Sequence, residues 1–138
     1  MPEKSILEQL VESESSKLSF QEIYEQIADY QIEMGFDPST YSDDRRMQVL
    51  RDYSVALMME QAEVLDEVSW KPWRTYESQK PKPNKRKLAL EWVDMLFFLI
   101  DQALTLELSS EELEAAFITK MKANVARIKS GYSKTQDV

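Results

Sequence analysis

The chain has 138 residues, a length that suits a single domain over 1–138, and its net charge is −8. It contains no cysteine and no histidine, so disulfides, thiolate chemistry, imidazole metal sites and histidine bases are excluded. Carboxylates, lysine, tyrosine or metal-bound water remain for acid–base chemistry, and Mg²⁺ or Mn²⁺ are the natural metal ions. The acidic balance argues against a nucleic-acid polymer as partner, and only two glycines and five prolines favour an all-α fold.

The beginning of the chain shows no targeting segment. Its first residues alternate charged and apolar types, without the basic start and apolar run of a signal peptide. The most apolar stretch, 88–108, is interrupted by Glu91, Asp94 and Asp101, which disfavours a membrane span. We therefore expect a soluble protein of the cytoplasm that does not bind membranes.

The first half of the chain predicts three helices. Residues 3–14 carry apolar side chains at helical spacing and suit a short amphipathic helix. Ser19 opens a capping box for a second helix, which ends near Met34. The Ser-Asp-Asp sequence at 42–44 suits the start of a long third helix that ends at about Val68.

The second half predicts a loop and two more long helices. Pro72 disfavours helical geometry in the residue before it, and 75–86 is interpreted as an exposed, mobile loop. A helix follows over about 87–107. A serine at position 109 or 110 caps the last helix, which runs to about Ser130, and the tail over 133–138 is expected to fray. The chain should form a compact bundle of four or five helices.

One long helix carries a row of glutamates. Glu60, Glu63 and Glu67 lie on one side of the helix over 43–68, because residues three, four and seven apart share a face. The neighbouring apolar stripe consists of Leu50, Tyr53, Leu57, Val64 and Val68. The three glutamates therefore lie at the edge of the buried face, which favours a binding role for them. The alternative is that they form an ordinary solvated face.

A second acidic pair lies on the most apolar helix. The segment 88–106 is apolar nearly all the way round, as expected for the centre of a bundle or an oligomer interface. Glu91 and Asp94 should therefore be largely enclosed, and each needs a cation, a proton or several donors. Antiparallel packing can bring them opposite the first pair of glutamates, where Mg²⁺ could bridge phosphate oxygens and activate water. The alternative is a buried ion pair with lysine or arginine.

The last helix carries a basic and polar face. Lys120, Asn124 and Arg127 share one side of it, followed by Gly131 and Tyr132. Lysine and arginine could hold phosphates and asparagine could hydrogen-bond a base or sugar, whereas the alternative is a solvated face. Basic blocks on either side of the second acidic pair suit a small, highly anionic ligand.

Together these residues resemble the motifs of the all-α NTP pyrophosphatase superfamily, within it the dimeric dUTPase-like and MazG-like proteins. The similarity covers about residues 50–132. The matching motifs are Glu60-Gln-Ala-Glu63, Glu91-Trp-Val-Asp94, Trp70-Lys71-Pro72-Trp73-Arg74, and Lys120, Asn124, Arg127 with Gly131-Tyr132. The resemblance implies a dimer or tetramer with a nucleotide substrate, and compact members of this kind often come from bacteriophages.

The resemblance also implies a reaction, the hydrolysis of dUTP to dUMP and pyrophosphate with Mg²⁺ or Mn²⁺. The implied metal ligands are Glu60, Glu63, Glu91 and Asp94, with Glu60 or Glu63 also orienting or deprotonating the water. The implied substrate-binding residues are Lys71, Trp73, Lys120, Asn124, Arg127 and Tyr132. Trp70 or Trp73 could stack on the base or pack in the core. The alternatives are dCTP or another nucleotide as substrate, and a non-catalytic helical binding protein.

Overall fold

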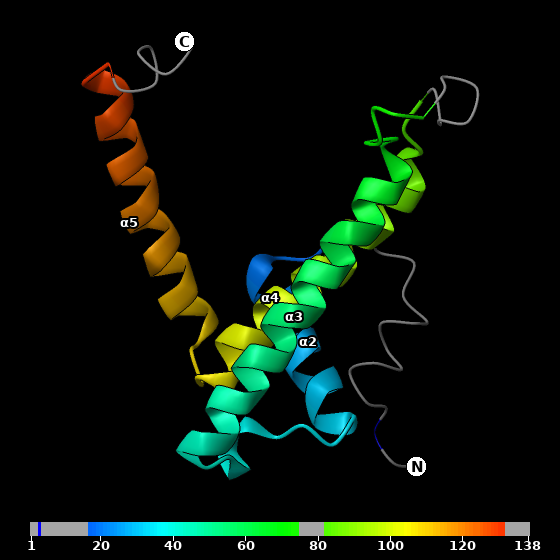
Figure 1. Cartoon of the computed structure of the whole chain (residues 1–138). Coiled ribbons are helices and arrows are strands. Elements are labelled where there is room, and N and C mark those ends of the chain that lie inside the picture. The colour runs from blue at the N-terminus through cyan, green and yellow to red at the C-terminus, as the bar shows by residue number, and fades with distance from the viewer. Residues whose placement is uncertain (1–2, 4–16, 75–81, 132–138) are drawn as a thin grey trace.

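The computed structural model describes residues 3, 17–74 and 82–131, and in these residues it contains helices and no strand. The helices are α2 (Phe20–Glu33), η1 (Pro38–Thr40, a 3₁₀ turn), α3 (Asp43–Glu67), α4 (Lys85–Thr105) and α5 (Ser110–Lys129) (Figure 1). The all-α prediction is therefore confirmed. The predicted helix over 3–14, except for residue 3, and the tail 133–138 lie outside the described residues. None of the described helices has the combination of length and apolarity that a membrane span requires.

The helices begin at polar capping residues. The side chains of Ser19, Ser42 and Ser109 each accept a hydrogen bond from the backbone N–H three residues ahead, which satisfies a donor that the first turn leaves free. Asn84 does the same for α4, which therefore begins at Lys85. Of the predicted mobile loop over 75–86, residues 75–81 lie outside the described residues. Its predicted end at residue 86 is wrong, because Asn84 caps the helix that begins at Lys85.

Two contacts at opposite ends hold α3 and α4 in an antiparallel pair. Near the start of α3, Arg46 donates to the backbone oxygen of Thr105 at 2.6 Å and forms a 3.1 Å ion pair with Glu107, both at the end of α4. At the other end, Lys87 Nζ lies 2.8 Å from Glu67 Oε1. Figure 1 shows the two helices side by side along their length. The predicted antiparallel packing is confirmed.

The small core joins α2 to α4 and to the start of α5. Tyr24 and Ile27 of α2 pack with Ile100 of α4, and all three side chains are buried. Leu113 of α5 packs against this cluster, and the Tyr24 hydroxyl donates to the backbone oxygen of Leu108. The beginning of α5 is thus fixed to α2 and α4.

Beyond its first turns, α5 points away from the α3–α4 pair (Figure 1). Its apolar side chains remain 43–65% exposed; they are Phe117, Ile118, Met121, Val125 and Ile128. In the described part of the chain six hydrophobic residues are buried, whereas 22 large hydrophobic residues are exposed. A single chain therefore covers little of its own apolar surface.

The outer side of α4 is open as well. Trp92 and Leu99, seven residues apart on one side of the helix, are each 54% exposed, because α2 and α3 do not cover that side. Leu90, near the beginning of α4, is 60% exposed on a different side. Asp94 is exposed on another side of α4, near Glu91, so the expectation that it is largely enclosed is wrong for the single chain. On α3, Val64 of the predicted apolar stripe is buried, but Val68 is 45% exposed because the helix ends there.

Replacing Ile100 by alanine tests the core. Ile100 is 1% exposed at the contact of α2 and α4, so Ile100→Ala should lower the free energy of unfolding by about 2–5 kcal/mol through lost contacts and a cavity. Leu106→Ala, at a position 53% exposed, is the control and should change it by about 0.5 kcal/mol or less. Urea unfolding at equal protein concentration measures both, and equal effects would show that this cluster is not the core.

Candidate metal centre

Three carboxylates meet where α3 and α4 run side by side. Glu60 and Glu63 extend from α3 and Glu91 from α4, and one oxygen of each lies within 4.8 Å of the others. The i, i+3 spacing turns both glutamates of α3 to the same side. The two end contacts of the helix pair fix the register that sets Glu91 opposite them. Three of the four predicted metal ligands are therefore brought together.

The three carboxylates are in an unfavourable environment without a cation. The Oε2 atoms of Glu60 and Glu91 are buried and have no hydrogen-bond partner within the described structure. Burial raises the pKa of Glu60, and the charges of Glu63 and Asp94 raise it further, against a hydrogen bond with Glu91 that lowers it. The pKa of Glu91 is also raised, first by burial and then by its hydrogen bond with Glu63 and the neighbouring charges. A bound cation would remove both penalties.

The donor set fits a hard divalent cation. All the available atoms are carboxylate oxygens, which Mg²⁺ and Mn²⁺ prefer, and the sequence offers no imidazole or thiolate for zinc or copper. The unpartnered oxygens of Glu60 and Glu91 supply the free lone pairs that such an ion needs. The residues present are therefore compatible with a metal site.

Asp94 lies at the edge of this group. It follows Glu91 by one helical turn, and its charge raises the pKa of both Glu60 and Glu91. It is not one of the three carboxylates that lie within 4.8 Å of one another, and it lines the adjoining cavity together with Glu60. Asp94 is therefore placed to face a ligand in that cavity.

Glu67, the third glutamate of the predicted row, has a different role. It is 5% exposed and its carboxylate is bound by the Lys87 ammonium, whose pKa is raised by this hydrogen bond and charge. The alternative of a buried ion pair, considered for Glu91 and Asp94, thus applies to Glu67. Its contribution is to the antiparallel register of α3 and α4.

A cavity of about 640 Å³ adjoins the carboxylates. It is lined by Tyr30, Gln31, Met34, Phe36, Tyr53, Glu60, Asp94, Phe97, Phe98 and Asp101. Aromatic and apolar walls with a few polar groups are typical of a pocket for a small organic ligand, and this volume lies in the usual range. The cavity and the carboxylates together form a site with one acidic end and one aromatic end.

Two polar residues in this cavity were not predicted as site residues. Gln31 of α2 is 3% exposed, donates from Nε2 to the Tyr53 hydroxyl at 2.7 Å, and has its Oε1 buried without a partner in the described structure. Asp101 of α4 is 8% exposed, and burial raises its pKa to about 7. The sequence signal for Asp101 is its position seven residues after Asp94, which puts both on one face. Gln31 shows no comparable signal.

The predicted substrate-binding residues of the last helix lie elsewhere. Lys120 and Arg127 are exposed on α5 and Asn124 is half-buried there, so this helix does not bring them to the carboxylates of its own chain. Tyr132 lies outside the described residues.

The tryptophan segment follows α3 directly. Ser69 has a φ of 52°, a left-handed conformation that ends the helix and redirects the chain. The rings of Trp70 and Trp73 meet edge-on at 5.5 Å, and Lys71 Nζ lies 6.0 Å from the Trp70 ring. Trp70 is 45% and Trp73 68% exposed, so neither is a core residue. Both remain open to a ligand.

A comparison with protein families matches residues 33–109, more than half of the chain, to the family described as dUTPase. The chain belongs to the all-α dUTPase family. The matched region contains Glu60, Glu63, Glu91 and Asp94. Comparisons with curated proteins and with solved structures found no match.

Membership of the dUTPase family decides the class of reaction. It supports dUTP pyrophosphohydrolase activity, so the chain is a nucleotide pyrophosphohydrolase with a nucleotide as substrate. The family uses divalent metal ions, and the acidic cluster of this dUTPase is the matching feature. The activity and fold that the motif resemblance implied are thereby confirmed.

The raised pKa of Asp101 predicts a pH-dependent stability. Because the pKa is about 7 in the folded protein against 3.8 ordinarily, the folded state holds a proton that the unfolded chain releases, and stability falls as pH rises between about 4 and 7. We expect the thermal midpoint, followed by circular dichroism, to decrease from about pH 5 to about pH 8. Asp101→Asn should lose part of this decrease, and an unchanged pH dependence in the variant would contradict the assignment.

Proposed function

We propose that this dUTPase holds Mg²⁺ between Glu60, Glu63, Glu91 and Asp94 and uses it to hydrolyse dUTP to dUMP and pyrophosphate. The observation that carries the proposal is the pair of buried, unpartnered carboxylate oxygens on Glu60 and Glu91, which face each other from two helices. A buried carboxylate without a partner is destabilising, so its presence in a folded site calls for a cation. Mn²⁺ would suit the same oxygens.

The carboxylates can both hold the ion and move a proton. The bound ion would neutralise phosphate charge and activate a water molecule. Glu60 is the better candidate to accept a proton from that water, because burial and the neighbouring acids raise its pKa above that of an ordinary glutamate. Glu63 is exposed at the same position and can orient the water.

The aromatic cavity is the proposed place of the deoxyuridine. Its acidic end, with Glu60 and Asp94, adjoins the carboxylate group, so a nucleoside in the cavity directs its phosphates to the ion. Phe97 and Phe98 offer rings for stacking, and the free Oε1 of Gln31 can accept a hydrogen bond from a base N–H. dCTP is the alternative substrate, since cytosine would fill the same volume.

The basic residues outside the cavity complete the proposed substrate site. Lys120, Asn124, Arg127 and Tyr132 are assigned to the nucleotide by the motif resemblance, and Lys71 and Trp73 are assigned with them. Charge supports the assignment, because Lys120 and Arg127 are exposed cations that can bind the phosphates of a nucleotide.

We also propose that the functional unit is a homodimer of single-domain chains, with a tetramer as the larger alternative. The exposed apolar side chains of Trp92 and Leu99 on the outer side of α4 support it. Patches of this kind on a small protein commonly mark an interface between copies.

Removal of a single carboxylate tests the metal site. Glu91→Gln removes a ligand charge, so Mg²⁺-dependent release of pyrophosphate from dUTP should fall by at least about 100-fold. Glu60→Gln and Asp94→Asn should act in the same direction, and EDTA should abolish the wild-type reaction. Asp52→Asn, an exposed position about 16 Å along α3 from Glu63, is the charge-matched control and should keep the wild-type rate. Full turnover in Glu60→Gln or Asp94→Asn would refute the site.

A substrate panel tests the base preference. Wild-type enzyme with Mg²⁺ should release pyrophosphate from dUTP with a higher kcat/KM than from dCTP, dTTP or the purine deoxynucleoside triphosphates. The unpaired Oε1 of Gln31 is an acceptor that suits the N3–H of uracil, a position at which cytosine has no hydrogen, while thymine adds a methyl group and purines a second ring. A higher kcat/KM for dCTP would assign the cavity to cytosine.

A further inference from the structure

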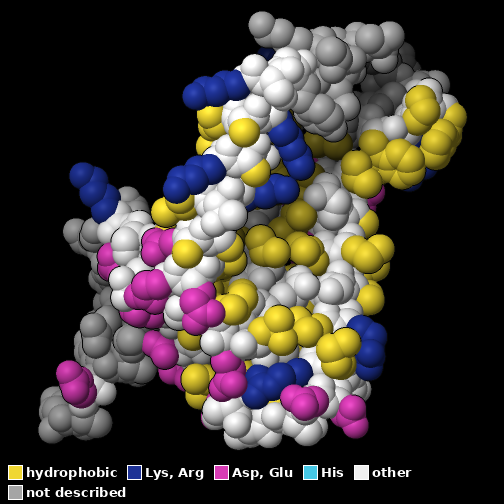
Figure 2. All heavy atoms as spheres, turned by 90° about the vertical axis from the view of Figure 1, so that its left-hand side faces the viewer, with side chains coloured by type: hydrophobic (Ala, Val, Ile, Leu, Met, Phe, Trp, Pro, Cys, Tyr) yellow, Lys and Arg dark blue, Asp and Glu magenta, His cyan; other side chains and the backbone are white. Residues whose placement is uncertain are grey.

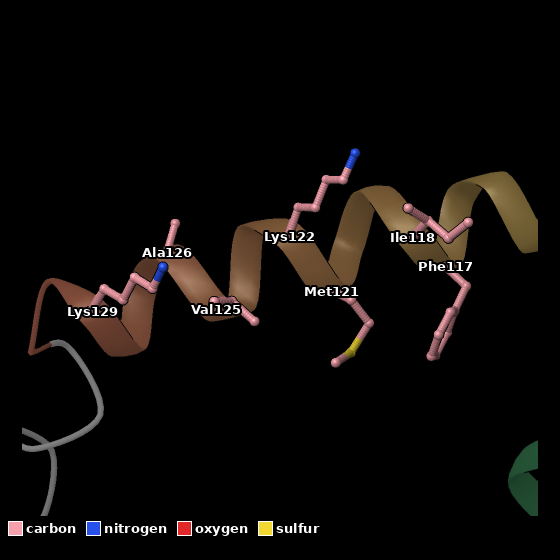
Figure 3. A pocket seen from close by; sticks show the side chains of 7 residues that line it. All are labelled: Phe117, Ile118, Met121, Lys122, Val125, Ala126 and Lys129. Carbon is pink, nitrogen blue, oxygen red and sulfur yellow. The ribbon is translucent and has the colours of Figure 1, made fainter.

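The groove on α5 and the aromatic cavity differ in what encloses them. All residues that line the groove belong to α5, and Figure 3 shows Phe117 and Met121 among them, extending from one side of this helix. The aromatic cavity is instead lined by residues of α2, α3 and α4. It can therefore surround a small ligand, and its few polar side chains decide which groups of that ligand are bound.

Asp101 is an acid placed where the ionised form of a carboxyl group is unfavourable. Figure 2 shows Asp and Glu side chains at the surface of the molecule, where water stabilises their charge. Asp101 is 8% exposed, and among the described residues no side chain forms an ion pair or a hydrogen bond with its carboxyl group. Burial raises its pKa to about 7. The carboxyl group therefore keeps a proton up to about neutral pH and can donate a hydrogen bond.

Gln31 and Asp101 lie at the same end of the cavity. Gln31 Nε2 donates to the Tyr53 hydroxyl at 2.7 Å, and the charge of Asp101 raises the pKa of the same tyrosine. The Oε1 atom of Gln31 is buried and accepts from no group of the described structure. The two side chains thus offer a ligand one acceptor, from the amide, and one donor, from the protonated acid.

This end of the cavity lies one nucleotide length from the metal-binding acids. Asp101 follows Asp94 by seven residues on the same face of α4, which is about 10 Å along the helix at 1.5 Å per residue. A nucleotide has a similar length from its first phosphate to the far edge of its base. Phosphates beside Glu60 and Asp94 therefore place the edge of the base near Gln31 and Asp101.

Uracil and cytosine differ at this edge. Uracil has an N3–H between two carbonyl oxygens, whereas cytosine has no hydrogen on N3 and carries an amino group at C4. We propose that the carboxyl group of Asp101 donates a hydrogen bond to a carbonyl oxygen of uracil, beside the N3–H that Gln31 accepts, and so selects uracil over cytosine. An ionised Asp101 would accept from the cytosine amino group instead. This inference rests on the proposed function, because it takes the cavity as the place of the base.

The other charged and titratable groups near Asp101 do not account for such a selection. Those beside it on the side of α3 are Tyr41, Arg45, Arg46 and Tyr53. Burial raises the pKa of both Tyr41 and Tyr53 above 10.0, so they keep their protons near neutral pH, and the two arginines do not line the cavity. Tyr30 of α2 lines the cavity as well. Glu60 and Asp94 lie at the phosphate end, where they act on uracil and cytosine nucleotides alike.

The pH dependence of substrate selection in the wild-type enzyme tests this role. The measured quantity is the ratio of kcat/KM for dUTP to kcat/KM for dCTP with Mg²⁺, in which titration at the shared triphosphate and metal ion cancels. From about pH 6 to about pH 8 the ratio should fall by about 10-fold or more, because a group with a pKa of about 7 changes there from mostly protonated to mostly ionised. A ratio that stays constant or rises would overturn the inference.

Two substitutions of Asp101 and one control assign the titration to this residue. Asp101→Asn keeps an N–H donor that does not titrate, so the ratio should no longer depend on pH. Asp101→Leu removes the donor and should lower kcat/KM for dUTP at about pH 6 by about 10-fold or more. Asp52→Asn, at an exposed position of α3, is the charge-matched control and should keep the wild-type pH dependence. A wild-type fall that persists in Asp101→Asn would assign it to another group and overturn the inference.

Nucleoside binding separates this inference from the proposed function. Deoxyuridine and deoxycytidine carry no phosphate, so isothermal titration without Mg²⁺ measures recognition of the base alone, and the preference for deoxyuridine should decrease with pH as well. A wild type that shows this preference but releases no pyrophosphate from any nucleotide would refute the proposed function alone. An active wild type whose substrate ratio does not change with pH would refute the role of Asp101 alone.

Discussion

The antiparallel pairing of α3 and α4 is the constraint on which the site depends. Arg46 fixes one end of the pair by binding the backbone of Thr105 and the carboxylate of Glu107, and the Lys87–Glu67 ion pair fixes the other. Between these two contacts the side-chain register cannot slide by a turn without breaking both. This rigidity is what can hold like charges together, because free helices would slip until the carboxylates separated. The structural role of Glu67 is thus to keep the three carboxylates of the two helices opposite one another.

The fold holds carboxylates in positions where their ionised form is destabilised. Glu60 and Glu91 each keep a buried oxygen without a partner, and both have a raised pKa for reasons of burial and mutual repulsion. Asp101 adds a third acid that burial disfavours, at the far side of the same cavity. A cation and a nucleotide reverse these penalties, so ligand binding should stabilise the folded chain as well as start the reaction. Under the proposed function, activity and stability would be coupled through the same few carboxylates.

Much of this arrangement could be predicted from local sequence, and the rest could not for a physical reason. Capping serines and the i, i+3 spacing of the acids depend only on neighbours along the chain, and the helices and the three converging carboxylates follow from them. The exposure of Asp94 could not be predicted from local sequence, because a helix that is apolar on all sides gives no indication of which side its own chain covers. The cavity is hidden for a related reason, because Gln31 and Asp101 come from different helices and meet only in the tertiary structure.

The uncovered surface explains why a chain of this size can be incomplete by itself. Its exposed apolar side chains on α4 and α5 would be buried by the second copy of the proposed homodimer. The position of Asn124 is informative here: it is half-buried although its neighbours Lys120 and Arg127 are exposed, and it borders the apolar strip. An amide at that boundary can enter an interface at lower cost than an ammonium group, because it carries no charge to desolvate. In the proposed homodimer, assembly would then set which polar groups of α5 are covered and which stay in solvent.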